Sequence, residues 1–382
     1  MLIKVERKTL DWALRIVSMA SSQRASAPVG FRSLRVDLDW KKKIMSLSCF
    51  NQTLFCRVDR IPFEVKGQPK EVPNVWALSV WELQPLLAAS LRRWVFMEQT
   101  DKNTLVVKTE AVVKFPLYAP EDVEITIPLA TKMQKGTKIF GADFFACAEI
   151  AARDMLRPVL TSVCLTADER LLATDGHSVA LVSSTGVCGP ALLSYELGPF
   201  FPYLLAGKDA LEFAFSGKDA DIHYVQFRSG PITVWSVVPD GQYPVKTIVD
   251  TVARASKAEK TLCVLDRKML EGMILRAKAI ANDDFQPLDI RKSSTAKTLE
   301  FGLPDRKGPN RRFVESLPVL SGEPLDRLVV TIGGLTKALG LCEKSKSKVV
   351  IAAPKDSRYP VLVYADKDKR RVFWLSRYRD DR

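Results

Sequence analysis

A pattern of one strand, one helix and a strand pair occurs three times along this 382-residue chain, and it limits the possible folds more than any single motif does. Apolar residues spaced three and four apart predict the three helices, at 8–19, 142–153 and 266–280. A short strand precedes each of them, at 2–5, 137–140 and 261–264. A repeat of this kind indicates an architecture assembled from similar units.

Each predicted helix is followed by a strand pair and later by a second helix. The strand pairs are 33–38 with 44–50, 160–165 with 171–181, and 288–290 with 298–302. The second helices are 79–89, 200–205 and 334–342, and Pro199 and Pro202 interrupt the middle one. We therefore predict an α+β fold of three similar domains, at 1–132, 133–256 and 257–382. An α+β protein without internal symmetry is the alternative.

The most distinctive stretch is Ala173-Thr-Asp-Gly-His-Ser-Val-Ala-Leu181. An Asp-Gly step after alternating apolar residues predicts a tight turn between two paired strands. Apolar residues 160–165 form the strand before it. The middle domain is therefore expected to present this turn at the end of a strand pair.

The net charge of +13 is distributed unevenly along the chain. It amounts to +6 in residues 1–132, −3 in 133–256 and +10 in 257–382. A basic balance favours a polyanionic partner, most often nucleic acid. Solubility alone would also account for it.

Several classes of chemistry find no support in the sequence. The seven cysteines (49, 56, 147, 164, 188, 263 and 342) form no C-x-x-C pair, and most lie among apolar neighbours, which argues against a disulfide framework or a zinc cluster. Glycine-rich nucleotide loops are missing, and the two histidines suggest no nucleophile arrangement. We expect that the protein is not an enzyme and that it binds no cofactor and no metal. A charged start and the absence of a long apolar run predict a cytoplasmic protein without a membrane span.

Four features together resemble a known family. They are Ala173–Val179, which is similar to A-T-D-G-H-R-L; Gly241-Gln-Tyr-Pro244, similar to G-R-F-P; the opening Val5-Glu-Arg7 with Arg24 and Pro28; and the last strand, Arg371–Ser376. The chain resembles the bacterial sliding clamps, the β subunit of DNA polymerase III, over nearly its whole length. The resemblance implies three clamp domains of two helices and antiparallel sheets each. Two chains would close head to tail as a homodimeric ring, with helices lining the hole.

The resemblance also implies the partners. The ring would encircle double-stranded DNA without regard to sequence, and it would tether the replicative DNA polymerase as a processivity factor. Phosphates carry no sequence information, so Lys and Arg on the inward helices would suit this task. The candidates are Lys8, Arg15, Arg24, Arg92, Arg93, Arg153, Arg157, Lys268, Arg276, Lys278 and Lys337. Each could instead be a solvated surface charge.

A pocket for short apolar peptide motifs of the polymerase and the clamp loader is the second implied site. An apolar cleft can gain affinity from a small motif. The matching residues are Leu160, Thr174, Gly176, His177, Ser178, Val179, Pro244, Val249, Phe373 and Leu375. Without the resemblance, each of them could be core or turn.

Departures from the family pattern leave a second function open. Ser178 replaces the family's Arg, Val179 replaces its Leu, and the charged tail 377–382 is longer than usual. The alternative is a clamp-like monomeric adaptor or decoy that binds such peptides without encircling DNA. For ring closure, the candidates are Val113, Phe115 and 76–81 on one side, and Met273, Ile274 and Ile280 on the other.

Overall fold

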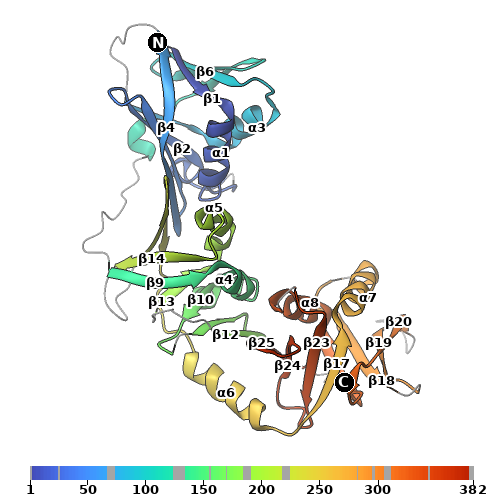
Figure 1. The fold of residues 1–382 in the computed structure, drawn as a ribbon. Coiled ribbons are helices and arrows are strands. Elements are labelled where there is room, and N and C mark those ends of the chain that lie inside the picture. Colours follow the sequence, from blue (N-terminus) through green and yellow to red (C-terminus); the bar gives the residue numbers. More distant parts are fainter. Residues whose placement is uncertain are drawn as a thin grey trace. The chain divides into compact units, whose positions relative to one another are not determined.

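The computed structural model describes most of the chain. The described residues are 2–24, 26–66, 74–123, 134–154, 156–168, 170–183, 191–216, 224–281, 283–294, 297–304, 311–342 and 345–377. They divide into two compact units, and both units combine helices with antiparallel sheets (Figure 1). The first comprises Met1–Gly141 and Glu196–Val238, and the second comprises Ala142–Tyr195 and Pro239–Arg382. The predicted tail after Arg377, Cys188 and most of the loop before β9 lie outside the described residues.

The first unit contains the N-terminal elements and part of the middle of the chain. Its strands are β1 (Leu2–Glu6), β2 (Ser33–Asp39), β3 (Ile44–Phe50), β4 (Leu54–Lys66), β5 (Val75–Ser79), β6 (Trp94–Asp101), β7 (Thr104–Lys108), β8 (Val112–Pro116), β9 (Gln134–Phe140), β14 (Ala210–Ser216), β15 (Tyr224–Ser229) and β16 (Ile232–Val237). Its helices are α1 (Arg7–Ser18), α2 (Val29–Arg32), α3 (Val80–Ala89) and α5 (Phe201–Leu205), with short 3-10 turns η1 (Pro120–Val123) and η3 (Tyr195–Phe200).

The second unit contains the rest. Its strands are β10 (Ser162–Leu165), β11 (Arg170–Thr174), β12 (Ser178–Ser183), β13 (Ala191–Ser194), β17 (Lys260–Asp266), β18 (Pro287–Lys292), β19 (Thr298–Pro304), β20 (Arg311–Pro318), β21 (Ser321–Gly322), β22 (Arg327–Thr331), β23 (Lys348–Pro354), β24 (Val361–Ala365) and β25 (Asp368–Leu375). Its helices are α4 (Gly141–Ala148), α6 (Val245–Lys257), α7 (Arg267–Ile280) and α8 (Ile332–Leu341), with the 3-10 turn η2 (Pro158–Thr161).

The chain makes three successive passes, β1–β8, β9–β16 and β17–β25, and the strand pairing repeats in each, as the sequence pattern predicts. A first strand leads directly into a helix at β1–α1, β9–α4 and β17–α7, and these strands pair with β6, β14 and β23 respectively. The strand after the helix pairs with two others in every pass: β2 with β3 and β5, β10 with β11 and β13, and β18 with β19 and β22. Three antiparallel strands end each pass, at β6–β8, β14–β16 and β23–β25.

Successive passes share sheets. The fourth strand of the first pass, β4, pairs with the last strand of the second, β16. The fourth strand of the second pass, β12, pairs with the last strand of the third, β25. Each sheet therefore continues across a predicted domain boundary, and this continuity is why the compact units cut through the middle pass. The division into three domains stays a prediction.

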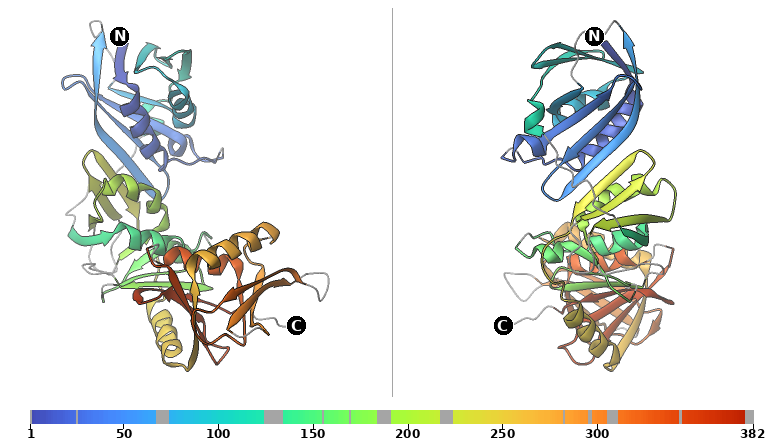
Figure 2. Two further views of the ribbon diagram at one scale, coloured as in Figure 1. Left: turned by 45° about the vertical axis from the view of Figure 1, so that its right-hand side comes forward. Right: turned by 90° about the vertical axis from the view of Figure 1, so that its left-hand side faces the viewer.

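Helices cover one face of these sheets because one stripe of each helix is apolar. On α1, Leu10, Leu14 and Val17 are buried, while Lys8 and Arg15 are exposed. In the second unit α7 and α8 lie side by side against the strands β17 and β23–β25 (Figures 1 and 2). None of the helices in the described part of the chain is long and apolar enough to cross a membrane.

Helix starts follow the local sequence, but one helix end differs from the prediction. Asp266 caps α7 by accepting a hydrogen bond from the Met269 backbone N–H at 2.9 Å. The helix predicted over 142–153 ends at Ala148. The Ala152 N–H donates instead to the Leu160 carbonyl at 2.9 Å, which turns the chain toward η2.

A buried ion pair connects the second pass to the third. The Arg371 guanidinium on β25 donates to Asp143 on α4 through Nε, at 2.8 Å from Oδ1. The exposed fractions of the two side chains are 11% and 1%. Removing one partner of such a pair leaves a buried charge uncompensated. This ion pair therefore reinforces the sheet junction between β12 and β25, and breaking it would lower the free energy of unfolding.

We expect Asp143→Asn to lower the free energy of unfolding of the second unit by about 3 kcal/mol, because Arg371 keeps its charge in a buried place. Urea denaturation measures this. The matched control is Asp168→Asn, since the pair of Asp168 with Arg170 is more exposed and should contribute less than about 1 kcal/mol. Equal effects of the two substitutions would contradict the account.

Candidate functional site

One cleft in the second unit has a volume of about 570 Å³. It lies among α6, the turn between β11 and β12, the segment before β24 and the end of β25. Its lining consists of Arg157, Leu160, Thr174, Gly176, His177, Val179, Pro244, Thr247, Ile248, Thr251, Val252, Ser357, Arg358, Tyr359, Pro360, Trp374, Ser376 and Arg377. A cleft of this size suits a few side chains of a ligand rather than a whole folded surface.

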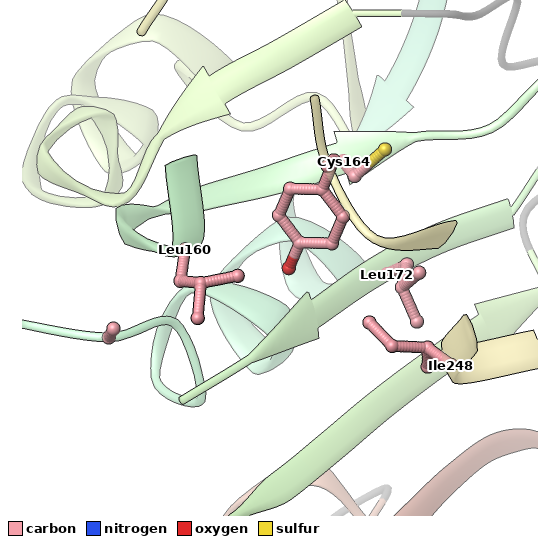
Figure 3. Close-up of a cluster of buried hydrophobic side chains, with 6 residues drawn as sticks. Leu160, Cys164, Leu172 and Ile248 are labelled. Carbon is pink, nitrogen blue, oxygen red and sulfur yellow. The ribbon is translucent and has the colours of Figure 1, made fainter. Parts of the chain in front are cut away.

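An apolar cluster supports the floor of the cleft. Leu160 of η2 and Ile248 of α6 belong to one buried cluster with Leu172 and Cys164 on the strands beneath (Figure 3). Burial raises the pKa of the Cys164 thiol to about 12, so this sulfur stays protonated and acts as an apolar group. The floor is thus a packed, rigid surface.

The Asp-Gly turn forms one wall, and its own side chains hold it. The Asp175 Oδ1 accepts hydrogen bonds from the N–H groups of His177 at 2.9 Å and Ser178 at 2.7 Å. Gly176 has a φ of +89°, in the left-handed region that favours glycine. Lys337 of α8 donates to the Asp175 Oδ2 at 3.0 Å. The tight turn predicted from the sequence is confirmed, and its outer edge faces the cleft.

Helix α6 forms the opposite wall, and the sequence reasoning missed it. The helix begins after Pro244, and Ile248, Val252 and Ala255 lie on one face. A proline at the start and apolar residues at helical spacing were the signals that could have revealed it. Thr251, on the second turn of α6, also lines the cleft.

Six of the ten residues predicted for the pocket line this cleft: Leu160, Thr174, Gly176, His177, Val179 and Pro244. The other four do not. Val249 follows the lining residue Ile248 on α6, and the remaining three lie on the other face of the sheet.

Strand alternation explains the three residues on the other face. Val179 of β12 lies opposite Trp374 of β25, whereas Ser178 lies opposite Leu375 and Ala180 opposite Phe373. Since side chains alternate along a strand, the first pair faces the cleft and the other two face away. Leu375 lies against Gly334 of α8. Trp374 and Ser376 therefore occupy the positions expected for Phe373 and Leu375.

The predicted DNA-contacting residues of the first unit are exposed. Lys8 and Arg15 lie on the outward face of α1. Arg92 and Arg93 follow α3 in the sequence and lie near the start of α1, where the Arg7 Nε donates to the Arg92 carbonyl at 3.0 Å. Arg24 lies in the loop after α1.

The predicted DNA-contacting residues of the second unit differ among themselves. Lys268, Arg153 and Arg157 are exposed, and Arg153 stacks on the Tyr195 ring. Three others have carboxylate partners: Arg276 with Glu315, Lys278 with Asp284, and Lys337 with Asp175. Their positive charge is therefore partly neutralised within the chain.

Solved structures of bacterial sliding clamps are similar to this fold. A sliding clamp from Bacillus subtilis is 16% identical and superposes with a TM-score of 0.77 over 99% of both chains. The DNA polymerase III β subunit of Thermotoga maritima is 14% identical, with a TM-score of 0.78 over 99% of this chain and 100% of that one. The β subunit of Pseudomonas aeruginosa is 16% identical, with a TM-score of 0.76 over 99% and 100%.

The chain has the fold of the DNA polymerase III β sliding clamps. No family model matches its sequence, and neither does any curated protein. The clamp fold is therefore recognisable from the structure and from the short motifs around Asp175 and Pro244, while overall identity stays near 15%.

We expect Gly176→Ala to lower the free energy of unfolding by about 1 kcal/mol, because a Cβ disfavours the left-handed backbone at this turn. The added Cβ would lie 2.9 Å from the Arg157 guanidinium, the movable end of a long side chain. Gly207→Ala is the matched control, since Gly207 has a φ of +86° and open space around it. Urea unfolding should give similar losses for both, and no loss for Gly176→Ala would contradict the described turn.

Proposed function

We propose that this chain is a DNA sliding clamp, a processivity factor in which two copies close a ring around duplex DNA. The observation that carries the proposal is the repeated strand junction. The fourth strand of one pass pairs with the last strand of the next at β4–β16 and again at β12–β25. By the same rule β20, the fourth strand of the third pass, needs the last strand of another pass, and β8, the last strand of the first pass, needs a fourth strand.

Both strands end their sheets. β8 pairs with β7 alone and β20 with β19 alone among the described strands. A second copy would supply β8 to this β20 and β20 to this β8, which makes two equivalent contacts related by a twofold axis. Unpaired edges invite such pairing, because their backbone N–H and C=O groups lack partners.

The existing junctions also suggest the register of the missing one. At the two junctions, Arg57 lies opposite Thr233 and Leu181 opposite Val372. Arg57 and Leu181 each belong to the third residue pair from a hairpin turn, and Val314 has that place in β20. On β8, Val112 is the outward-facing residue nearest the turn between β7 and β8, so we place it opposite Val314. Val112 is 67% exposed and Val314 is 53% exposed, so pairing them would cover two apolar side chains.

Helix α7 would contribute to the same contact. It packs on β20, and Arg276 of α7 pairs with Glu315 of β20 through two hydrogen bonds. Leu275 beside it is 70% exposed. Of the residues considered earlier for ring closure, Met273, Ile274, Phe115 and Trp76 are buried in their own unit, while Ile280 is 41% exposed. Leu275 is therefore the better candidate on this helix.

We expect Leu275→Glu to separate the two copies, because a carboxylate would be buried at an apolar contact without a partner. Light scattering should give twice 42.7 kDa for the unaltered chain and 42.7 kDa for the variant at micromolar concentration. Leu156→Glu is the control, since Leu156 is 87% exposed and lies in the second pass away from β20. A single-chain mass for the unaltered protein at every concentration would favour the monomeric adaptor instead.

Exposed cations on the helices would meet the DNA. Lys8 on α1, with Arg92 and Arg93 beside the start of this helix, and Lys268 on α7 have the exposure that phosphate contact requires. Contacts to phosphates alone allow a ring to move along DNA, because phosphates are the same at every sequence. Four cations are weaker candidates because each already has a carboxylate partner: Arg15, Arg276, Lys278 and Lys337.

We expect Lys8→Gln to reduce the slope of log affinity against log salt concentration by about 1, since one phosphate contact is lost. Fluorescence anisotropy with a labelled duplex at several salt concentrations measures the slope. Lys41→Gln is the matched control: it removes the same charge from an exposed residue that lines a cleft beside β2 and β4. Equal changes for both variants would refute a specific role for α1.

The cleft described above would hold the partners. A polymerase or clamp loader that inserts a short apolar segment there would stay close to the DNA without further contacts. The linked polymerase then rebinds its substrate at a high effective concentration. We assign the chain no catalytic step.

A further inference from the structure

A second cleft, in the first unit, has a volume of about 680 Å³ and lies among β2, the turn between β2 and β3, the middle of β4 and the end of β15. We propose that it binds an acidic peptide segment of a partner protein, and that Lys41, Arg60 and Arg228 at its rim receive the carboxylates. This site involves neither the cations proposed to meet DNA nor the cleft of the second unit. It therefore adds a second partner surface to the proposed function.

The carboxylates in the floor of this cleft are already engaged within the chain. The Asp59 Oδ1 accepts hydrogen bonds from the Arg57 Nε and the Ser46 Oγ, both at 2.7 Å. Burial alone would raise the pKa of Asp59, but these bonds and the nearby arginine charges outweigh burial and lower it. Asp37 accepts from the Arg35 Nε at 2.9 Å and from the Arg57 Nη1 at 3.4 Å. The floor is therefore ionised and neutralised by its own arginines.

Three cations at the rim lack such a partner. Lys42 is engaged, since its Nζ lies 3.2 Å from the Asp39 Oδ2. Lys41, Arg60 and Arg228 also line the cleft and are exposed, and none of them forms an ion pair with a residue that the structure describes. Arg228 attracts a carboxylate of the floor only at longer range. The rim thus presents three positive charges to an incoming anion.

An irregularity in β4 places one of these cations at the cleft. Between two regular residue pairs of β3 and β4, Asp59 and Arg60 together lie opposite the single residue Ser46. This arrangement is a β-bulge, which changes the direction of side chains along a strand. As a result Asp59 and Arg60 both line the cleft, although neighbouring side chains of a regular strand point to opposite faces.

The bulge holds Arg60 in an unfavourable backbone conformation. Its φ is +64°, in the left-handed region that favours glycine. The other described non-glycine residues with positive φ lie in turns, at Lys43, Ala206, Lys297 and Lys367, whereas Arg60 lies within a strand. A side chain at this position destabilises the fold relative to glycine. What the arginine supplies in return is a guanidinium at the cleft, and strain of this kind is typical of functional sites.

The mixture of charges favours a peptide over nucleic acid. A nucleic acid carries a negative charge at every nucleotide, so its backbone would lie against the carboxylates of the floor. A peptide can place Asp or Glu at the rim cations and uncharged residues over the floor. Trp40, Ile44 and Val75 are half-buried in the lining and offer apolar contact to those uncharged residues.

The test uses the full-length chain and a fluorescein-labelled eight-residue peptide in which Glu alternates with Thr. Its twin carries Gln in place of each Glu. We expect the Glu peptide to bind about tenfold more tightly than the twin, as measured by fluorescence anisotropy. Arg60→Gln and Arg228→Gln should each reduce this preference about fivefold, because each removes one charged donor to a carboxylate.

Two further variants separate the cleft from the net positive charge of the chain. Lys102→Gln and Arg254→Gln each remove an exposed cation that does not line the cleft. Both should keep the tenfold preference, because an attraction by net charge alone is screened by salt and does not depend on one position.

Arg60→Gly provides a readout that a purely structural arginine would not give. It removes the guanidinium and relieves the left-handed backbone together. We expect the preference to fall about fivefold while the midpoint of urea unfolding stays equal or rises. Glu64→Gly is the matched control, since Glu64 is an exposed residue of the same strand with a negative φ, and its midpoint should fall.

Equal binding of the two peptides by the unaltered chain would overturn the site, and so would a preference that survives both arginine substitutions to Gln. An unlabelled eight-nucleotide oligothymidine that displaces the labelled peptide more effectively than the unlabelled Glu peptide would also overturn it, because the ligand would then be nucleic acid. These results do not bear on the mass of the assembly or on the cleft of the second unit. This inference and the proposed function therefore fail separately.

Discussion

Backbone hydrogen bonding between strands of successive passes is the constraint on which the rest of this structure depends. The pairs β4–β16 and β12–β25 join strands that lie far apart in the sequence, and they turn three similar passes into continuous sheets. A single pass would leave two strand edges open, and open edges associate with whatever strand is available. The chain closes two such junctions itself. The proposed ring follows from the two edges that remain.

The same junction positions the cleft. Because β12 and β25 are paired, Val179 and Trp374 stand side by side, and the turn after Thr174 is brought to the end of β25. The ion pair of Asp143 with Arg371 and the bond from Lys337 to Asp175 hold this arrangement from behind. Disturbing the junction would therefore disturb the proposed partner site, even where no lining residue changes.

Sequence reasoning succeeded where the signal was local and stopped where it depended on pairing. The Asp-Gly turn, the three strand–helix starts and the α+β class were readable, because turn chemistry and apolar spacing act over a few residues. Which face Phe373, Trp374 and Leu375 present depends on the register against β12, which no local pattern reveals. The carboxylate partners of Arg276 and Lys337 likewise come from other elements, β20 and the turn between β11 and β12. Six of the residues predicted for the pocket line the cleft, whereas Phe373 and Leu375 lie on the other face of β25.

The most direct test of the central claim is a disulfide between copies. Val112→Cys with Val314→Cys places thiols on the two open edges, and the six native cysteines that the structure describes are buried and should not compete. After mild oxidation, the account predicts a covalent species of twice the chain mass on a denaturing gel, formed only when both substitutions are present. A control that joins Val314→Cys with Leu91→Cys should stay single, since Leu91 is 93% exposed and lies outside both edges. If the Val112 and Val314 pair also stays single under the same conditions, the edge-to-edge ring is contradicted.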